Sequence, residues 1–188
     1  MTYTKVFSEF EVTQIGFKFN EESAYESCEC VGSAEDAAEA KTVVKKCRGV
    51  EVKTRTKGTG KGEIKLSLHI PYNIYVKMLG MEDENLKDGV VAYGDDSRHA
   101  VFSMVAKVED EDGNVKYKAY PNCIIKEAPS NSTENGAEEI AELEVTISYM
   151  PDEHGKGRYE AIESVLTDET VKKWMTAFTP ELVRIRSV

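Results

Sequence analysis

Apolar and polar residues alternate with a period of two through most of this chain, and that pattern favours β-strands. The alternation is clearest in residues 50–57 and 63–70, which flank the glycine-rich stretch 58–62. Each of the two segments has one apolar and one polar face, which is typical of a sheet with one side on a core. The pattern predicts a hairpin that turns at residues 58–62.

The same alternation predicts further strands along the chain. They comprise residues 6–12, 16–19, 27–31, 101–108, 115–125, 140–150 and 159–162. Residues 109–114 (Glu-Asp-Glu-Asp-Gly-Asn) have the composition of a turn that joins two of these strands. No linker or repeat divides the 188 residues, so we expect a single, mainly β domain over residues 1–188.

Two short helices are expected among the strands. Pro71 suits the first helical position and Gly80 provides a stop, which predicts a flanking helix over residues 72–79. Thr167 is a suitable N-cap for a second helix, followed by a tail, within residues 166–188. An apolar stripe at helical spacing predicts that this second helix packs on the core. The stripe comprises Val171, Trp174, Met175 and Phe178.

Charge is distributed unevenly along the sequence. The net charge of −10 argues against a protein that binds nucleic acid through its phosphates, because such binding needs an excess of Lys and Arg. Residues 127–153 contain eight acidic residues and no Lys or Arg, whereas residues 41–65 contain nine basic and two acidic residues. The two segments are either separate solvated faces or complementary patches that meet between copies of the chain.

No motif supports catalysis or the binding of a cofactor. The stretch from Gly58 to Lys61 lacks the spacing of a phosphate-binding loop, and Asp110 and Asp112 lack the remaining ligands of a calcium loop. The three histidines are scattered and accompany no nucleophile motif. We therefore expect a non-enzymatic protein with no cofactor and no metal.

Four cysteines and the N-terminal residues bear on the cellular compartment. The N-terminus lacks the apolar region of a secretory signal, and no apolar run is long enough to span a membrane. Synthesis in the cytoplasm, with no membrane partner, is the resulting expectation. Cys28, Cys30, Cys47 and Cys123 are then expected to be reduced, as small buried thiols rather than metal ligands.

Several short segments carry a resemblance to a known family. They comprise residues 30–33, 45–50, 53–60, 68–71, 79–81, 89–94, 107–117, 120–123 and 134–139. The most specific are Lys107–Tyr117, Tyr120–Cys123 and Glu134–Glu139. Over about residues 6–165 the chain resembles the major tail (tail-tube) proteins of siphophages and related tailed phages of Gram-positive hosts.

The resemblance implies a β-sandwich or barrel of the tail-tube type with a flanking helix. It also implies a virion protein that assembles with itself into hexameric rings, which stack into a hollow tube through which DNA leaves the capsid. A tape-measure protein and a tail terminator are the implied partners. Two alternatives remain open: the tube of a contractile particle or secretion system, and, in a different class, a monomeric ligand-binding β-barrel.

Residues 33–49 have no clear pattern, since their Ala and Glu content favours helix while residues 42–44 favour strand. We interpret them as a loop that neighbouring subunits order, with an ordinary surface excursion as the alternative. Six charged residues within this loop are candidates for contacts between subunits. They are Glu35, Asp36, Lys41, Lys45, Lys46 and Arg48.

The lumen of such a tube would be lined by the polar face of one strand. Two faces compete for this position: Glu142, Glu144, Thr146 and Ser148 on one strand, and Glu51, Lys53, Arg55 and Lys57 on another. Basic side chains would retain passing DNA, because each contact with a phosphate adds salt-dependent affinity. Charge therefore favours the face with Glu142, Glu144, Thr146 and Ser148 as the lumen lining.

Overall fold

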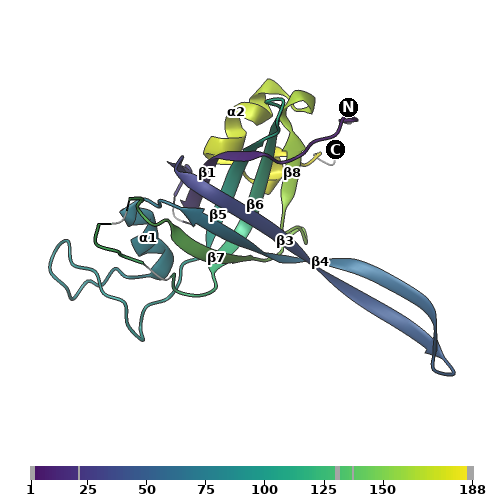
Figure 1. Ribbon diagram of the computed structural model, residues 1–188, viewed down its shortest axis with the longest axis horizontal. Coiled ribbons are helices and arrows are strands. Elements are labelled where there is room, and N and C mark those ends of the chain that lie inside the picture. The colour runs from purple at the N-terminus through teal and green to yellow at the C-terminus, as the bar shows by residue number, and fades with distance from the viewer. Residues whose placement is uncertain (1–2, 21, 130–131, 137, 186–188) are drawn as a thin grey trace.

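The computed structural model describes residues 3–20, 22–129, 132–136 and 138–185. Within them, eight strands form one antiparallel sheet in the order β2-β1-β5-β6-β7-β4-β3, and β8 pairs with β6 (Figure 1). The strands are β1 (Glu11–Phe19), β2 (Glu26–Cys28), β3 (Val31–Cys47), β4 (Val50–Leu68), β5 (Phe102–Glu109), β6 (Val115–Ile125), β7 (Leu143–Tyr149) and β8 (Tyr159–Ile162). The helices are α1 (Tyr72–Leu79) and α2 (Asp168–Ala177), with short 3-10 turns at Glu163–Val165 and Pro180–Leu182. The expectation of a mainly β fold with two short helices is confirmed.

The main core lies inside the curled sheet, where β4 and β7 pack across β1 and β5. Figure 1 shows β3 and β4 crossing in front of β5 and β6, as the two layers of a sandwich do. The alternating apolar residues of each strand point into this space. Its largest fully buried members include Ile15, Phe17, Ile64, Leu68, Phe102, Met104 and Tyr120.

Helix α1 closes one end of this core with Ile74, Met78 and Leu79. Pro71 takes the N-cap position, one residue earlier than predicted, and its carbonyl accepts the first helical hydrogen bond, 3.1 Å from Tyr75 N. Gly80 ends the helix in the left-handed conformation, with φ of 60°. A Cβ atom there would lie 2.1 Å from Arg98 O, so glycine is required for both its conformation and its size.

Helix α2 covers the opposite face of the sheet, over β5, β6 and β8. Thr167 caps it as predicted, accepting a hydrogen bond from Thr170 N at 3.3 Å. Trp174, the single tryptophan, is 1% exposed and donates from its indole nitrogen to Lys118 O at 3.2 Å. Its ring stacks on Tyr117 and contacts Phe178. The predicted apolar stripe thus forms a second, smaller core.

The predicted turn at residues 58–62 is wrong. Strand β4 runs without a break from Val50 to Leu68, and the hairpin turns instead at Arg48 and Gly49, which have φ of 50° and 82°. The glycine-rich stretch forms a β-bulge: Ala38 pairs with Gly62 and Ala40 with Gly58, so β4 has two extra residues between these pairs. Gly60, with φ of 75°, accommodates them.

The predicted loop at residues 33–49 is also wrong, because nearly all of it belongs to strand β3. Most of β3 is exposed on both sides, so no face is buried and the alternation that marks the other strands is lost. Smaller differences concern strand ends: β1 starts at Glu11 rather than at residue 6, and β7 at Leu143 rather than at residue 140.

None of the helices in the described parts of the chain is long and apolar enough to cross a membrane.

Candidate assembly interface

The outer part of the β3–β4 hairpin projects from the body of the molecule (Figure 1). We call residues 40–58 the arm, from the Ala40–Gly58 pair to the turn. All of its residues are exposed, including Val43, Val50 and Val52, which are 56–65% exposed. With a rise of about 3.3 Å per residue, the arm extends about 25 Å. A two-stranded ribbon with both faces in water is marginally stable, so the arm is a candidate for contact with another surface.

The two faces of the arm differ in charge. Residues paired across an antiparallel ladder share a face, as do residues two apart on one strand. One face is cationic, and its cross-strand pairs are Lys41–Lys57, Val43–Arg55 and Lys45–Lys53. Before the register shift that follows Lys45, the opposite face is uncharged and β-branched: Thr42 pairs with Thr56, their hydroxyls 2.9 Å apart, and Val44 pairs with Thr54. Val52 extends the same side of β4.

Like charges directly opposite each other destabilise a ladder. Lys46 and Glu51 form the one ion pair recorded among the arm residues, at 3.9 Å, and neither belongs to the like-charged pairs. Within the three pairs of the cationic face no carboxylate offsets the repulsion, and Glu51, two residues from Lys53, is paired with Lys46. The isolated chain carries this repulsion as an energetic cost.

Asp36 anchors the root of the arm. It lies on β3 opposite Ile64, and its side chain is only 8% exposed. Its Oδ2 accepts hydrogen bonds from Tyr120 Oη at 2.7 Å and from the Arg158 guanidinium at 2.5 Å, and its Oδ1 accepts one from Tyr149 Oη at 3.3 Å. Lys118 Nζ lies 3.9 Å from Oδ2. One carboxylate thus ties β3 to β6, β7 and the start of β8.

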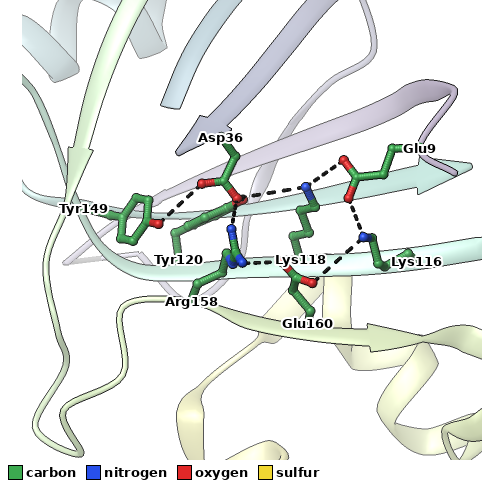
Figure 2. Close-up of polar contacts among 8 residues, drawn as sticks. All are labelled: Glu9, Asp36, Lys116, Lys118, Tyr120, Tyr149, Arg158 and Glu160. Atoms are coloured by element: carbon green, nitrogen blue, oxygen red, sulfur yellow. Dashed lines mark hydrogen bonds and ion pairs between the residues drawn. The ribbon is translucent and has the colours of Figure 1, made fainter. Parts of the chain in front are cut away.

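The anchor continues into a chain of alternating charges (Figure 2). Glu9 pairs with Lys116 and, at 2.9 Å, with Lys118, while Glu160 lies 2.7 Å from Arg158 and 3.9 Å from Lys116. Burial alone would raise the pKa of Glu9, but hydrogen bonds from the two lysines outweigh it and hold that pKa below its ordinary value. The network is therefore built for a charged Glu9.

The charge of Asp36 also shifts the pKa values of Tyr120, Tyr149 and Arg158. Burial and the neighbouring Asp36 carboxylate raise the pKa of Tyr149 to about 12 and raise the pKa of Tyr120 further. Burial would lower the pKa of Arg158, but Asp36 raises it overall. Near neutral pH the two phenols stay protonated and remain donors to Asp36.

Two glycines allow the arm root to pack closely. A Cβ atom on Gly62 would lie 2.2 Å from Tyr149 Oη, the group that donates to Asp36. A Cβ atom on Gly157 would lie 1.8 Å from Gly60 O, so the 151–158 loop touches the bulge directly. The glycine-rich stretch therefore serves close packing at the root rather than a turn.

The four predicted lumen residues share one polar side of the molecule. Thr146 and Ser148 are half-buried on the outer face of β7, opposite Lys65 and Glu63, and Glu144 is exposed opposite Ser67. Glu142 precedes β7, and its Oε2 accepts a hydrogen bond from Ser67 Oγ at 2.6 Å. The competing face, Glu51 to Lys57, lies on the arm instead.

The six candidates for inter-subunit contacts divide into two groups. Asp36 is largely buried and is used within its own chain, since its side chain is 8% exposed and is paired with Arg158. The other five are exposed: Glu35 lies 3.8 Å from Lys65, Lys41 and Lys45 lie on the cationic face, Lys46 pairs with Glu51, and Arg48 forms the turn.

Two kinds of potential metal ligand occur among the described residues: the four cysteines, and a group of His and Glu side chains that lie close together. Cys28 and Cys123 are buried thiols, as expected, and burial raises the pKa of both, whereas Cys30 and Cys47 are exposed. Glu153, His154 and Glu181 hold ligand atoms within 4.8 Å of one another. Contacts of His154 Nε2 with Glu153 at 3.4 Å and with Glu181 at 3.1 Å account for this cluster, and the hydrogen bond with His154 lowers the pKa of Glu181.

Comparison with known proteins yields likeness in structure alone. No protein family and no curated protein matches the sequence. The cap of the anti-feeding prophage, described as its tube terminating cap, is similar over 86% of this chain and 96% of its own, with 11% identity and a TM-score of 0.51. A chain of the anti-feeding prophage baseplate covers 86% and 97%, with 10% identity and a TM-score of 0.42, a value below that of a shared fold. The chain therefore shares its fold with the tube terminating cap of the anti-feeding prophage.

Proposed function

We propose that this chain is a structural, non-enzymatic subunit of a phage tail or phage-tail-like particle, where it assembles with copies of itself around a tube. The observation that carries the proposal is the arm. Nineteen residues form an ordered ribbon that contributes nothing to the core of its own chain and exposes valines on both faces. Such a ribbon gains stability when another subunit covers it.

The shared fold helps to choose between two kinds of particle. The fold of the tube terminating cap favours a component of a contractile, tail-like particle over the non-contractile tail tube that the sequence resembles. In either case the subunits form rings, for which we propose six copies as in the tail-tube family. A heterologous contact closes a ring when its rotation divides a full turn, and stacking contacts that do not close extend the tube.

The partners and the location follow from that role. Copies of the chain are the principal partner, and a tape-measure protein and a tail terminator are the partners that the tail-tube resemblance implies. The assembled protein is located in the particle after synthesis in the host cytoplasm. DNA, where the particle delivers it, passes without sequence-specific binding.

The proposal also assigns the residues that line the lumen of the tube. We place Glu142, Glu144, Thr146 and Ser148 on it, because Glu142 and Glu144 repel phosphate whereas the cationic face of the arm would retain it. Reversing both glutamates to Lys leaves assembly intact, since both are exposed, and makes delivery of DNA slow and salt-dependent. Delivery kinetics equal to those of the parent particle at low salt would place these glutamates outside the lumen.

A monomeric ligand-binding β-barrel, the alternative of a different class, finds no support in the sheet interior. The space bounded by Val12, Ile64 and Tyr120 measures about 20 Å³, which is room for roughly one water molecule. Side chains fill the rest of the core. A ligand of ordinary size would need a cavity of about 300 Å³ or more.

Sedimentation and negative-stain microscopy test the assembly directly. The purified chain is expected to form rings or tubes whose amount rises with concentration. A matched variant replaces residues 41–57 by a two-residue Asn-Gly turn, which cuts the arm at the Ala40–Gly58 pair and keeps Asp36. This variant should remain a folded monomer. A full-length chain that stays monomeric at high concentration, or a shortened chain that assembles normally, refutes the proposal.

A further inference from the structure

The cationic face of the arm has a counterpart elsewhere on the chain. Residues 127–139, here called the acidic segment, contain four exposed carboxylates and no Lys or Arg. They are Glu127, Glu134, Glu138 and Glu139. Among the described residues no ion pair involves any of the four.

The two charged surfaces lie at opposite ends of the molecule. Ser132, within the acidic segment, lines a hollow with Tyr72 and Tyr75 of α1, which places the segment beside that helix. Figure 1 shows the arm pointing away from α1, on the far side of the sheet. Register agrees, because β7 starts opposite Leu68 and ends opposite Gly62, so β4 leads from the acidic segment toward the arm. One chain therefore cannot bring the two surfaces together.

We propose that the cationic face of the arm docks on the acidic segment of a second copy of this chain. The five cations of the arm face four carboxylates, and within the described parts of the chain neither surface has an ion-pair partner. Carboxylates next to Lys41–Lys57 and Lys45–Lys53 would offset the repulsion within these two cross-strand pairs. Because complementary surfaces lie at opposite ends, the contact is head to tail and each copy offers a free arm and a free acidic segment to the next.

This inference rests on the proposed function and specifies its contact. It also gives each face of the arm a separate role. The cationic face contacts carboxylates, so the uncharged face, with Val44 and Val52, can pack on an apolar surface. Nucleic acid is the competing occupant of a cationic face. The matching acidic segment and the net charge of −10 favour a copy of the chain instead.

Charge reversal in three variants tests the docking. The arm variant carries Lys41→Glu, Lys53→Glu and Lys57→Glu, and the segment variant carries Glu134→Lys, Glu138→Lys and Glu139→Lys. The swapped variant carries all six changes. A control variant carries Lys5→Glu, Lys87→Glu and Lys172→Glu, which are exposed positions away from the arm, so its net charge matches that of the arm variant.

Assembly is measured by sedimentation velocity at low and high salt. The arm and segment variants should each need at least about tenfold more protein for half-assembly than the control variant, and the swapped variant should recover. Salt should weaken assembly of the natural chain, because exposed charges are screened. If the natural chain assembles and the arm variant assembles like the control, the docking is refuted while the proposed function stands.

Two further outcomes are distinct from that one. A natural chain that remains monomeric refutes the proposed function and the docking together. Fluorescence polarisation with a labelled double-stranded DNA oligonucleotide covers the other occupant. Binding that the arm variant loses, with its assembly unchanged, would make the cationic face a nucleic-acid surface and overturn the docking.

Discussion

Replacing Asp36 by Asn tests the anchor at the root of the arm. The substitution keeps the size of the side chain and removes its charge. An amide oxygen still accepts one hydrogen bond, but the amide NH₂ group then faces donors from Arg158 and Tyr120, which need an acceptor. The change therefore leaves buried donors unsatisfied rather than merely deleting a contact.

The size of the effect follows from the exposure of the partners. Removing one member of a buried ion pair costs about 3–5 kcal/mol. Here Arg158 is 32% exposed and keeps Glu160, and Lys118 keeps Glu9 at 2.9 Å, so both retain some compensation. We expect the free energy of unfolding to fall by about 2–3 kcal/mol, or roughly 4–12 °C in Tm for a chain of this size.

Urea denaturation followed by the fluorescence of Trp174 measures this loss, since the single tryptophan is buried on α2. Glu35→Gln is the matched control, because Glu35 is the neighbouring residue, is 73% exposed and lies 3.8 Å from Lys65. That control should change stability by less than about 0.5 kcal/mol. An Asp36→Asn variant as stable as the Glu35→Gln variant would show that the network contributes nothing to the anchor.

Three further predictions concern the arm root, the turn and pH. Gly62→Val should destabilise the chain by about 1–3 kcal/mol in urea melts, because its side chain displaces Tyr149 from Asp36, whereas Gly58→Val should be tolerated, since nothing lies within 4 Å there. Arg48→Gly should stabilise the hairpin by about 1 kcal/mol, measured by thermal melting, because Arg48 has φ of 50°; an unchanged Tm would contradict this. Hydrogen bonds to the Asp110 carboxylate hold its pKa low despite its burial, so its stabilisation is present above pH 3.8 and is lost as pH falls through the lower folded pKa. Stability of Asp110→Asn should accordingly change less with acid than that of the natural chain.

The parts of the fold that were predictable have local causes. The turn at 109–114 and the two helices follow from signals within a few residues: Asp110 accepts from Asn114 N at 2.7 Å, Gly80 stops α1 and Thr167 caps α2. The strands around the core were also predictable, because burial on one face imposes alternation. Val145 and Ile147 of β7 are buried between polar neighbours, as predicted.

The parts that were not predictable depend on contacts between distant residues. Residues 58–62 have the composition of a turn, yet their glycines make room for Tyr149 and Gly157, about a hundred residues along the chain. Asp36 meets Tyr120, Tyr149 and Arg158, which are 84, 113 and 122 residues away. No local pattern marks such a carboxylate as buried. In an alanine-rich stretch the sequence around an Asp predicts a surface residue, and only the tertiary structure shows that Asp36 is buried.

Strand β4 belongs to the arm and to the core at once, and this has a mechanical consequence. A pull on the arm is carried along one continuous backbone from Val50 to Leu68, into residues that pair with β7 on one side and β3 on the other. The load then acts parallel to the strands, so the hydrogen bonds of both ladders resist it together in shear instead of opening one by one. The bulge at Gly60 is the compliant point along this path, where the ribbon can bend while the strand stays in register. A particle built from such subunits would yield to bending at the arm roots and resist stretching along its strands.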